Sequence, residues 1–242
     1  MRVWYQNNSI WQETASLSEA LGLSSFVKGC IAVIGSGGKT STIFRLAEEF
    51  AARDLRVVIT TTTRMFREPG ELATTIEEVR ELLKRQSIVI AGRPAEAGKI
   101  AGLEEEQARE LVRIADIVLV EADGSKRLPL KVPASHEPVI PDDVDKIILV
   151  AGLSGIGTRL SGCCHRTELA GELLEVSSEH IIRPMDIAGM LKKGYLEQQL
   201  AGRGQVRVLL NQADHIGFRK AGEEIADIMA PYPCVIGKLK EE

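Results

Sequence analysis

Short apolar, β-branched runs alternate with longer amphipathic segments along this 242-residue chain, and the alternation sets the fold class. The runs are CIAVIG, RVVITTT, SIVIAG, DIVLVEAD, KIILVAG, VRVLLNQAD and PCVIG. Because they are almost wholly apolar, they suit strands of a parallel sheet that is covered on both faces. Apolar residues near helical spacing fill 40–52, 72–84, 103–114 and 218–229 between them. The pattern predicts an α/β fold, a three-layer, doubly wound, mainly parallel sheet.

Two segments depart from this alternation. Residues 124–143 contain four prolines and few consecutive helix formers, which predicts an ordered functional loop. Residues 155–204 contain helix-like segments at 167–176 and 185–191, separated by glycine or proline. We interpret 155–204 as a mostly helical insertion within a single domain that spans 1–242.

Composition and charge narrow the classes of partner. The net charge is -4 and the basic residues are scattered among acidic ones, so a large basic face for nucleic acid is not expected. No apolar run approaches membrane-spanning length, and the first thirty residues do not resemble a signal peptide. We therefore expect a cytoplasmic protein that binds neither nucleic acid nor membrane.

The four cysteines, Cys30, Cys163, Cys164 and Cys234, lack the spacing of a structural zinc site and are expected to be reduced thiols. The adjacent Cys163 and Cys164, followed by His165, could bind a soft metal or a selenium species. Burial in the core is the more common role for cysteine and is the favoured interpretation.

The stretch IGSGGKTST lies between a predicted strand and a predicted helix and has the chemistry of a phosphate-binding loop. Glycines allow successive backbone N–H groups to turn toward an anion, a lysine reaches the terminal phosphates, and a hydroxyl binds Mg²⁺. The start of the helix adds its positive dipole end. The predicted phosphate-binding residues are Gly35, Ser36, Gly37, Gly38, Lys39, Thr40 and Ser41, which makes the expected fold P-loop NTPase-like.

One position departs from the full motif G-x-x-x-x-G-K-[ST], which would place glycine at Val33. The shorter form G-x-x-G-K-[ST] is satisfied by Gly35, Gly38, Lys39 and Thr40, and this loop resembles those of Mur-type ligases. The alternative is a tight strand-to-helix turn that contains a lysine by chance.

Motifs after other strands should meet at the same sheet edge as this loop. Asp123, with Glu121 close behind, follows a strand where P-loop proteins carry the acidic ligand of Mg²⁺, although D-G can also be a simple turn. In TTTTRM, the hydroxyls of Thr62 and Thr63 are candidates for phosphate binding, and Arg64 could neutralise developing charge. Thr60 and Thr61 are equally well explained as strand residues.

NQAD, at 211–214, resembles the N-K-x-D guanine motif with glutamine in place of lysine. Asp214 would accept hydrogen bonds from guanine, and Asn211 would bind the base or tie loops together. The missing lysine weakens the preference for GTP over ATP, and Asp214 could instead cap a helix.

Taken together, GSGGKTS, TTTTRM, VEADGSKRLPLK, PASHEPVIP, CHRTEL and LLNQAD resemble the YqeC-type accessory proteins of selenium-dependent molybdenum hydroxylases, also called selenium cofactor biosynthesis proteins. The resemblance covers nearly the whole chain. It implies a nucleotide-binding protein that acts in maturation of a selenium-containing molybdenum centre, with a hydroxylase or its cofactor as partner. It does not imply a particular reaction.

The proline-rich loop would then hold Lys126, Arg127, Lys131, His136 and Glu137 beside the metal carboxylates. Lys126 and Arg127 could bind an anionic substrate or the γ-phosphate, and His136 could transfer a proton or bind metal. His165 and Arg166 form a weaker second candidate. The predicted catalytic residues are Lys39, Arg64, Asp123 and His136.

Three functions remain open at this point. The first is a Mg²⁺-dependent NTPase (a hydrolase) or an NTP-dependent transferase that uses ATP or GTP. The second is a nucleotide-gated chaperone that delivers selenium or molybdenum cofactor without chemistry of its own. The third, ranked last, is a Mur-like ATP-dependent ligase, for which no second substrate domain is recognisable.

Overall fold

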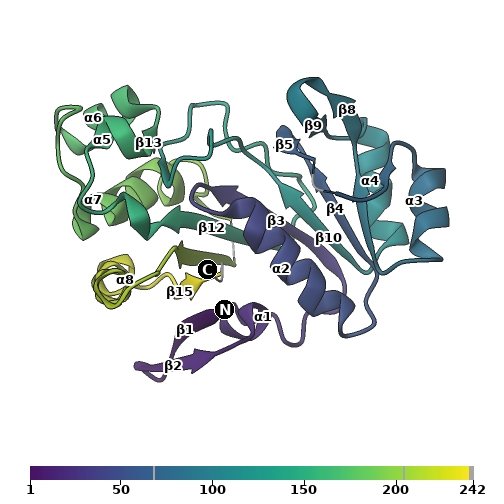
Figure 1. Ribbon diagram of the computed structural model, residues 1–242, viewed down its shortest axis with the longest axis horizontal. Helices are drawn as coiled ribbons and strands as arrows, with labels where there is room; N and C mark the ends of the chain where they lie inside the picture. Colours follow the sequence, from purple (N-terminus) through teal and green to yellow (C-terminus); the bar gives the residue numbers. More distant parts are fainter. Residues whose placement is uncertain (68, 204, 240–242) are drawn as a thin grey trace.

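The computed structural model describes residues 1–67, 69–203 and 205–239, and its centre is a ten-stranded sheet (Figure 1). Along the sheet the strands are β2 (Ile10–Thr14), β1 (Arg2–Asn7), β15 (Cys234–Lys238), β14 (Val206–Asn211), β12 (Lys146–Gly152), β3 (Gly29–Gly35), β10 (Ile117–Glu121), β4 (Val57–Thr61), β7 (Ile88–Ala91) and β6 (Leu72–Ala73). All neighbours from β15 to β6 are parallel, whereas β1 is antiparallel to both β15 and β2. The predicted mainly parallel α/β sheet is confirmed.

Helices cover both faces of this sheet. Successive residues of β3 alternate between two hydrophobic clusters, because side chains along a strand point to opposite faces. Ile31 and Val33 belong to the cluster formed with α1 (Leu17–Ala20) and α2 (Lys39–Ala51). On the opposite face, the other cluster includes residues of α3 (Ile76–Leu83), α4 (Glu105–Ile114), α7 (Pro184–Gly189) and α8 (Ile216–Met229). The molecule therefore has the predicted three layers.

The segment predicted as a helical insertion consists of short elements. They are η2 (Leu153–Gly155), α5 (Leu160–Cys163), β13 (Cys164–His165), α6 (Thr167–Leu174), α7 and the π-helix η3 (Met190–Leu196). β13 pairs in parallel with β11 (Leu130–Lys131), so this segment is attached directly to the proline-rich loop. Gly204, the predicted end of the insertion, lies outside the described residues.

A second small sheet, which was not predicted, stands beside the main one (Figure 1). Its strands are β5 (Arg64–Phe66), β9 (Lys99–Ala101) and β8 (Arg93–Ala95), with the one-turn helix η1 (Glu96–Gly98) between the last two. The strands have only three residues each, which is too short to produce a recognisable alternation.

The helix predicted for 72–84 begins later than expected. Leu72 and Ala73 form the edge strand β6, and Thr75 caps α3 by accepting a hydrogen bond from the backbone N–H of Glu78. The threonine prevents the helix from extending toward the N-terminus, because an N-cap residue has non-helical backbone angles. Within the described residues, the helices are all too short or too polar to span a membrane.

Candidate functional site

A cavity of about 960 Å³ lies at the sheet edge where β3, β10 and β14 end, and β5 forms another side of it. In doubly wound folds this is the edge at which ligands bind. Ten of the predicted site residues line the cavity: Gly37, Gly38, Lys39, Thr40, Ser41, Arg64, Glu121, Lys126, Asn211 and Asp214. The structure thus brings together motifs that are separated in sequence by up to 177 residues, the interval from Gly37 to Asp214.

The loop between β3 and α2 has a conformation that requires glycine. Gly35, Gly37 and Gly38 have φ values of 92°, 82° and 125°, which residues with a Cβ rarely adopt. A Cβ on Gly37 would also lie 2.3 Å from the backbone nitrogen of Gly152. The loop is therefore pressed against the end of β12, and only a bare backbone fits there.

Some backbone N–H groups of this loop donate hydrogen bonds within the protein, and others do not. Gly35 N–H donates to Asp123 Oδ2 at 3.0 Å, and Ser36 N–H donates to the carbonyl oxygen of Val150 at 2.8 Å. Among the described residues, the N–H groups of Gly37 and Gly38 have no acceptor, and the first turn of α2 adds further unpaired donors. A cradle of free N–H groups therefore faces the cavity from residue 37 onward, but not from residues 35 and 36.

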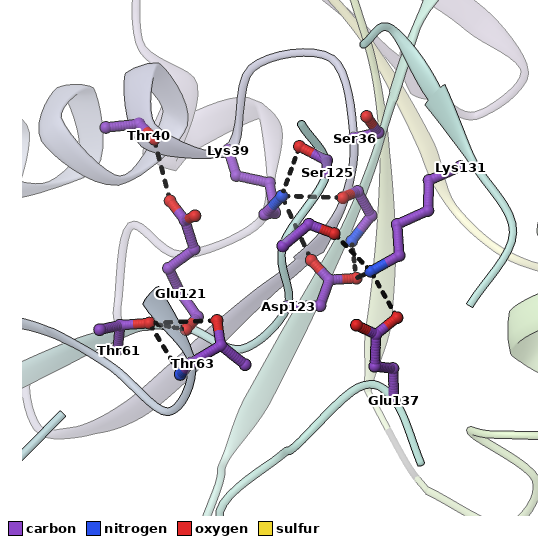
Figure 2. A network of polar contacts seen from close by, with 12 residues as sticks. Ser36, Lys39, Thr40, Thr61, Thr63, Glu121, Asp123, Ser125, Lys131 and Glu137 are labelled. Atoms are coloured by element: carbon purple, nitrogen blue, oxygen red, sulfur yellow. Dashed lines mark hydrogen bonds and ion pairs between the residues drawn. The ribbon is translucent and has the colours of Figure 1, made fainter. Parts of the chain in front are cut away.

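Lys39, the first residue of α2, is held by three oxygen atoms (Figure 2). Its Nζ lies 2.9 Å from the carbonyl oxygen of Gly35, 3.1 Å from Ser125 Oγ and 3.2 Å from Asp123 Oδ1. The side chain is only 3% exposed, although it lines the cavity. An incoming phosphate would have to compete with these oxygens for the ammonium group.

Thr40 and Glu121 form the second polar pair of the site. Thr40 Oγ1 donates to Glu121 Oε2 at 2.9 Å, and both residues line the cavity (Figure 2). Burial raises the pKa of Glu121, against the opposing effects of the Lys39 charge and the Thr40 hydrogen bond. A hydroxyl and a carboxylate side by side are oxygen donors of the kind that Mg²⁺ prefers.

Asp123 lies deeper than Glu121 and does not line the cavity. Its fully buried carboxylate lies between two ammonium groups, with Oδ1 3.2 Å from Lys39 Nζ and Oδ2 3.3 Å from Lys131 Nζ. Tyr195 OH donates to Oδ2 at 3.3 Å, and burial together with the Asp123 charge raises the pKa of this phenol. The surroundings of Asp123 suit a positioning carboxylate, so the geometry favours Glu121 over Asp123 as a metal ligand, the reverse of the order expected from sequence.

The network continues from Asp123 into the proline-rich loop. Lys131 Nζ lies 2.8 Å from Glu137 Oε2, which also accepts a hydrogen bond of 2.6 Å from Arg166 (Figure 2 shows the Lys131 contacts). Burial would raise the pKa of Glu137, but the hydrogen bonds from Arg166 and Lys131 outweigh it and lower the pKa to about 2. Buried ion pairs thus connect the P-loop lysine with β11 and the start of α6.

Several predicted site residues lie outside the cavity. The hydroxyl of Thr62 donates to the carbonyl oxygen of Val139, and the backbone N–H of Thr63 donates to Thr61 Oγ1, so this turn supports the fold. His136 is exposed and does not line the cavity, because the loop turns outward at 135–136. The positions of Thr62, Thr63 and His136 therefore give no support to nucleotide binding or catalysis. Gly35 and Ser36 also lie outside the cavity, and their N–H groups hold the loop through hydrogen bonds to Asp123 and Val150.

The NQAD segment lies on the other side of the P-loop. Asn211 Nδ2 donates to the carbonyl oxygen of Gly37 at 2.9 Å, which ties the end of β14 to the loop. Asp214 is exposed and lines the cavity. It does not cap α8, because His215 is the N-cap residue and accepts from Phe218 N–H. The helix-capping explanation of Asp214 is therefore wrong.

The adjacent cysteines are core residues. Cys163 and Cys164 are buried, and burial raises the pKa of Cys164 to about 12, so its thiol remains protonated. In the described part of the chain, no group of three or more His, Cys, Asp or Glu residues could hold a metal ion by itself. A divalent ion at Thr40 and Glu121 would need phosphate oxygens as additional ligands, which is how Mg²⁺ commonly binds.

Several residues that line the cavity or contact Asp123 were not predicted as site residues. Ser125 and Phe66 line the cavity, as does Lys99, whereas Tyr195 reaches Asp123 from the helical segment. Ser125 was part of a recognised motif, but its contact with Lys39 depends on the turn after β10. Lys99 and Phe66 come to the cavity through the small β5–β9 sheet, which was not predicted.

Comparison with known proteins agrees with these motifs. The family model described as YqeC protein matches residues 31–168, which include the P-loop, the β10 motif and β13. The uncharacterized protein YqeC of Escherichia coli (strain K12) is 32% identical over 171 residues, or 67% of each chain. The chain belongs to the YqeC family.

Among solved structures, this YqeC-family chain is similar to the signal recognition particle receptor FtsY from Elizabethkingia anophelis. The TM-score is 0.44 at 17% sequence identity, and the match covers 96% of this chain and 68% of the other.

Proposed function

We propose that this YqeC-family protein binds ATP or GTP with Mg²⁺ and hydrolyses or transfers the terminal phosphate, as an accessory protein in maturation of a selenium-dependent molybdenum hydroxylase or its cofactor. The observation that carries the nucleotide proposal is the cradle of free N–H groups beside Lys39 and the Thr40–Glu121 pair, all open to one cavity. The maturation role rests on the family resemblance.

The residues divide the work as follows. The N–H groups from Gly37 to the first turn of α2 would bind phosphate oxygens, and Lys39 would exchange its contact with Asp123 for one with phosphate. Thr40 and Glu121 would hold Mg²⁺, which neutralises charge on the phosphates. Arg64, exposed at the cavity wall, would stabilise charge that develops on the transferred group.

Turnover of ATP and of GTP with Mg²⁺, with and without the hydroxylase, tests this proposal. The wild type and the exposed-surface control Lys220→Ala should release phosphate at the same rate, and Lys39→Ala should lose at least about a hundredfold. Absence of turnover under all conditions, or an unchanged rate in Lys39→Ala, would contradict the enzymatic proposal.

A nucleotide-gated chaperone remains the second candidate, because of one specific observation. Lys39 is joined through Asp123 and Lys131 to Glu137, so a phosphate that draws Lys39 away alters the ion pairs of the proline-rich loop. The nucleotide could thus order or release that loop without chemistry on a substrate. A difference in hydroxylase affinity between nucleotide-free and nucleotide-bound protein would support this candidate; equal affinity in every state would exclude gating.

A further inference from the structure

One side of the cavity carries basic residues around an aromatic ring, and the nucleotide proposal uses only one of them, Arg64. We name Arg64, Phe66, Lys99 and Arg127 the basic wall; all four line the cavity. Three come from β5 and β9 of the small sheet, and Arg127 comes from the turn after β10. Lys126 precedes Arg127 in that turn and lines the cavity as well.

The charges of the basic wall are concentrated around a single aromatic ring. The guanidinium carbon of Arg127 lies 3.8 Å from the centroid of Phe66, and Lys99 Nζ lies 4.9 Å from it. Cation–π contacts hold both charges in place without neutralising them. Two positive charges held close together repel each other. An anion bound in the cavity beside them would reduce this repulsion, so the arrangement favours anion binding.

In the described part of the chain, no Asp or Glu carboxylate pairs with the basic residues of the wall. There, none of Arg64, Lys99, Lys126 and Arg127 forms an ion pair, whereas basic residues elsewhere, such as Arg56 with Asp116, do. The turn that presents Lys126 and Arg127 is also unusual, because their φ values are 50° and 62°. Two successive left-handed residues with side chains are costly and tend to be kept at functional positions.

The basic wall and the predicted base-binding segment lie on opposite sides of the P-loop. In the sheet, β14 is two strands from β3 in one direction, and β4, which leads into β5, is two strands away in the other. A nucleotide that extends from the P-loop toward Asp214 would therefore leave the β4 side of the cavity free. The volume of about 960 Å³ is near the upper end of the roughly 300–1,000 Å³ typical of ligand pockets.

We propose that the basic wall is a second binding site, for a small phosphate-bearing substrate that occupies the cavity together with the nucleotide. Guanidinium groups bind phosphate oxygens in pairs, and two of the four wall residues are arginines. This inference rests on the proposed function only in placing the nucleotide on the Asp214 side. It distinguishes a transferase or substrate-binding protein from a simple NTPase.

The test is a calorimetric titration of the full chain with inorganic pyrophosphate. The protein is first saturated with Mg²⁺ and a non-hydrolysable ATP or GTP analogue, with Mg²⁺ in excess over both ligands, so that the P-loop is occupied. The variant Lys99→Gln/Arg127→Gln removes two charges from the wall and leaves Arg64, which the proposed function uses, intact. The matched control Arg85→Gln/Arg113→Gln removes the same charge at two exposed positions outside the cavity. Circular dichroism and melting temperature establish that each variant folds.

The wild type and the control should bind one further equivalent of pyrophosphate. The wall variant should bind it about tenfold more weakly or worse, with nucleotide affinity changed by less than about threefold. The proposal is overturned if the nucleotide-loaded wild type binds no pyrophosphate, or if the wall variant binds it normally. It is also overturned if nucleotide affinity falls as much as pyrophosphate affinity, because the wall would then belong to the nucleotide site.

Failure of the nucleotide proposal would be recognised separately. If the protein binds no ATP or GTP analogue, pyrophosphate is titrated into the free wild type, Lys39→Ala and the wall variant. Binding that survives in Lys39→Ala and is lost in the wall variant would support the basic wall by itself. Binding that is lost only in Lys39→Ala would assign the anion to the P-loop and overturn the second site.

Discussion

Lys39 and Asp123 form an ion pair inside the molecule, with Nζ 3.2 Å from Oδ1 and side chains that are 3% and 0% exposed. Asp123 Oδ1 makes this contact without the geometry of a hydrogen bond, so it is an acceptor that is not fully satisfied. The lysine that is proposed to bind phosphate therefore has an anionic partner before any ligand arrives. Phosphate binding exchanges one anion for another, which limits the desolvation cost of the exchange.

Asp123→Asn should destabilise the protein strongly. The substitution leaves the Lys39 and Lys131 ammonium groups buried without their shared carboxylate. Removing one partner of a buried ion pair typically costs about 3–5 kcal/mol. Urea unfolding measures the change, and the exposed Asp227→Asn on α8 is the control. A loss below about 1 kcal/mol would mean that Asp123 does not hold the two lysines together.

Glu121→Gln should remove the advantage that Mg²⁺ gives to nucleotide binding. The amide keeps the size of the side chain and can still accept a hydrogen bond from Thr40, but it lacks the negative charge that strengthens Mg²⁺ binding. Nucleotide affinity is measured with Mg²⁺ and with EDTA. The ratio of the two affinities should fall by about tenfold or more in the variant and stay unchanged in Glu106→Gln, an exposed control on α4. An unchanged ratio in Glu121→Gln would exclude this carboxylate as the metal ligand.

Asp214→Ala should abolish a preference for GTP over ATP while phosphate binding persists. The carboxylate is exposed at the cavity and does not cap α8, so it is available to the guanine base. Loss of its hydrogen bonds to the base should cost about 1–3 kcal/mol of GTP affinity, without a matching loss for ATP. Competition between the two nucleotides measures the preference, with Asp142→Ala as an exposed control. Equal competition by ATP and GTP in the wild type would rule out guanine recognition.

Glu137→Gln should make stability less dependent on pH in the acid range. The folded pKa of Glu137 is about 2, below its ordinary 4.5, so the charged group stabilises the fold fully above about pH 4.5 and loses this effect as the pH falls toward 2. The difference corresponds to on the order of 3 kcal/mol. Unfolding free energies of wild type and variant should differ at pH 7 and converge near pH 2. An equal difference at both pH values would contradict this role, and Glu224→Gln on α8 is the control.

The parallel sheet and the glycine-rich loop between β3 and α2 were predictable because their causes are local. Each central strand is a continuous apolar run, and the glycines of the loop precede a lysine and a helix. Parallel order then places the ends of β3, β10 and β14 at one edge, which explains why Thr40, Glu121 and Asp214 could be assigned to one site.

The features of the site that the sequence does not reveal depend on contacts across the fold. The sequence does not reveal that Lys131 approaches Asp123 from β11, which makes Asp123 a buried ion-pair partner. Likewise, the hydroxyl of Thr62 donates a hydrogen bond to the carbonyl oxygen of Val139, a residue of the proline-rich loop. Spacing along the chain places a residue at the end of a strand, but tertiary packing decides whether its side chain faces the cavity or the interior.

Calorimetric titration with ATP and GTP in the presence of Mg²⁺ tests the central claim, that the free N–H groups of the P-loop bind a nucleoside triphosphate. Gly37→Ala is the most informative comparison, because a Cβ there would meet the backbone of Gly152 and strain a φ of 82°. Gly70→Ala, whose Cβ would meet no atom within 4 Å although φ is also positive, is its control. The account predicts one nucleotide per chain for the wild type and Gly70→Ala, and none for a folded Gly37→Ala. A wild type that binds neither nucleotide, or a Gly37→Ala variant that binds as well as the wild type, would contradict it.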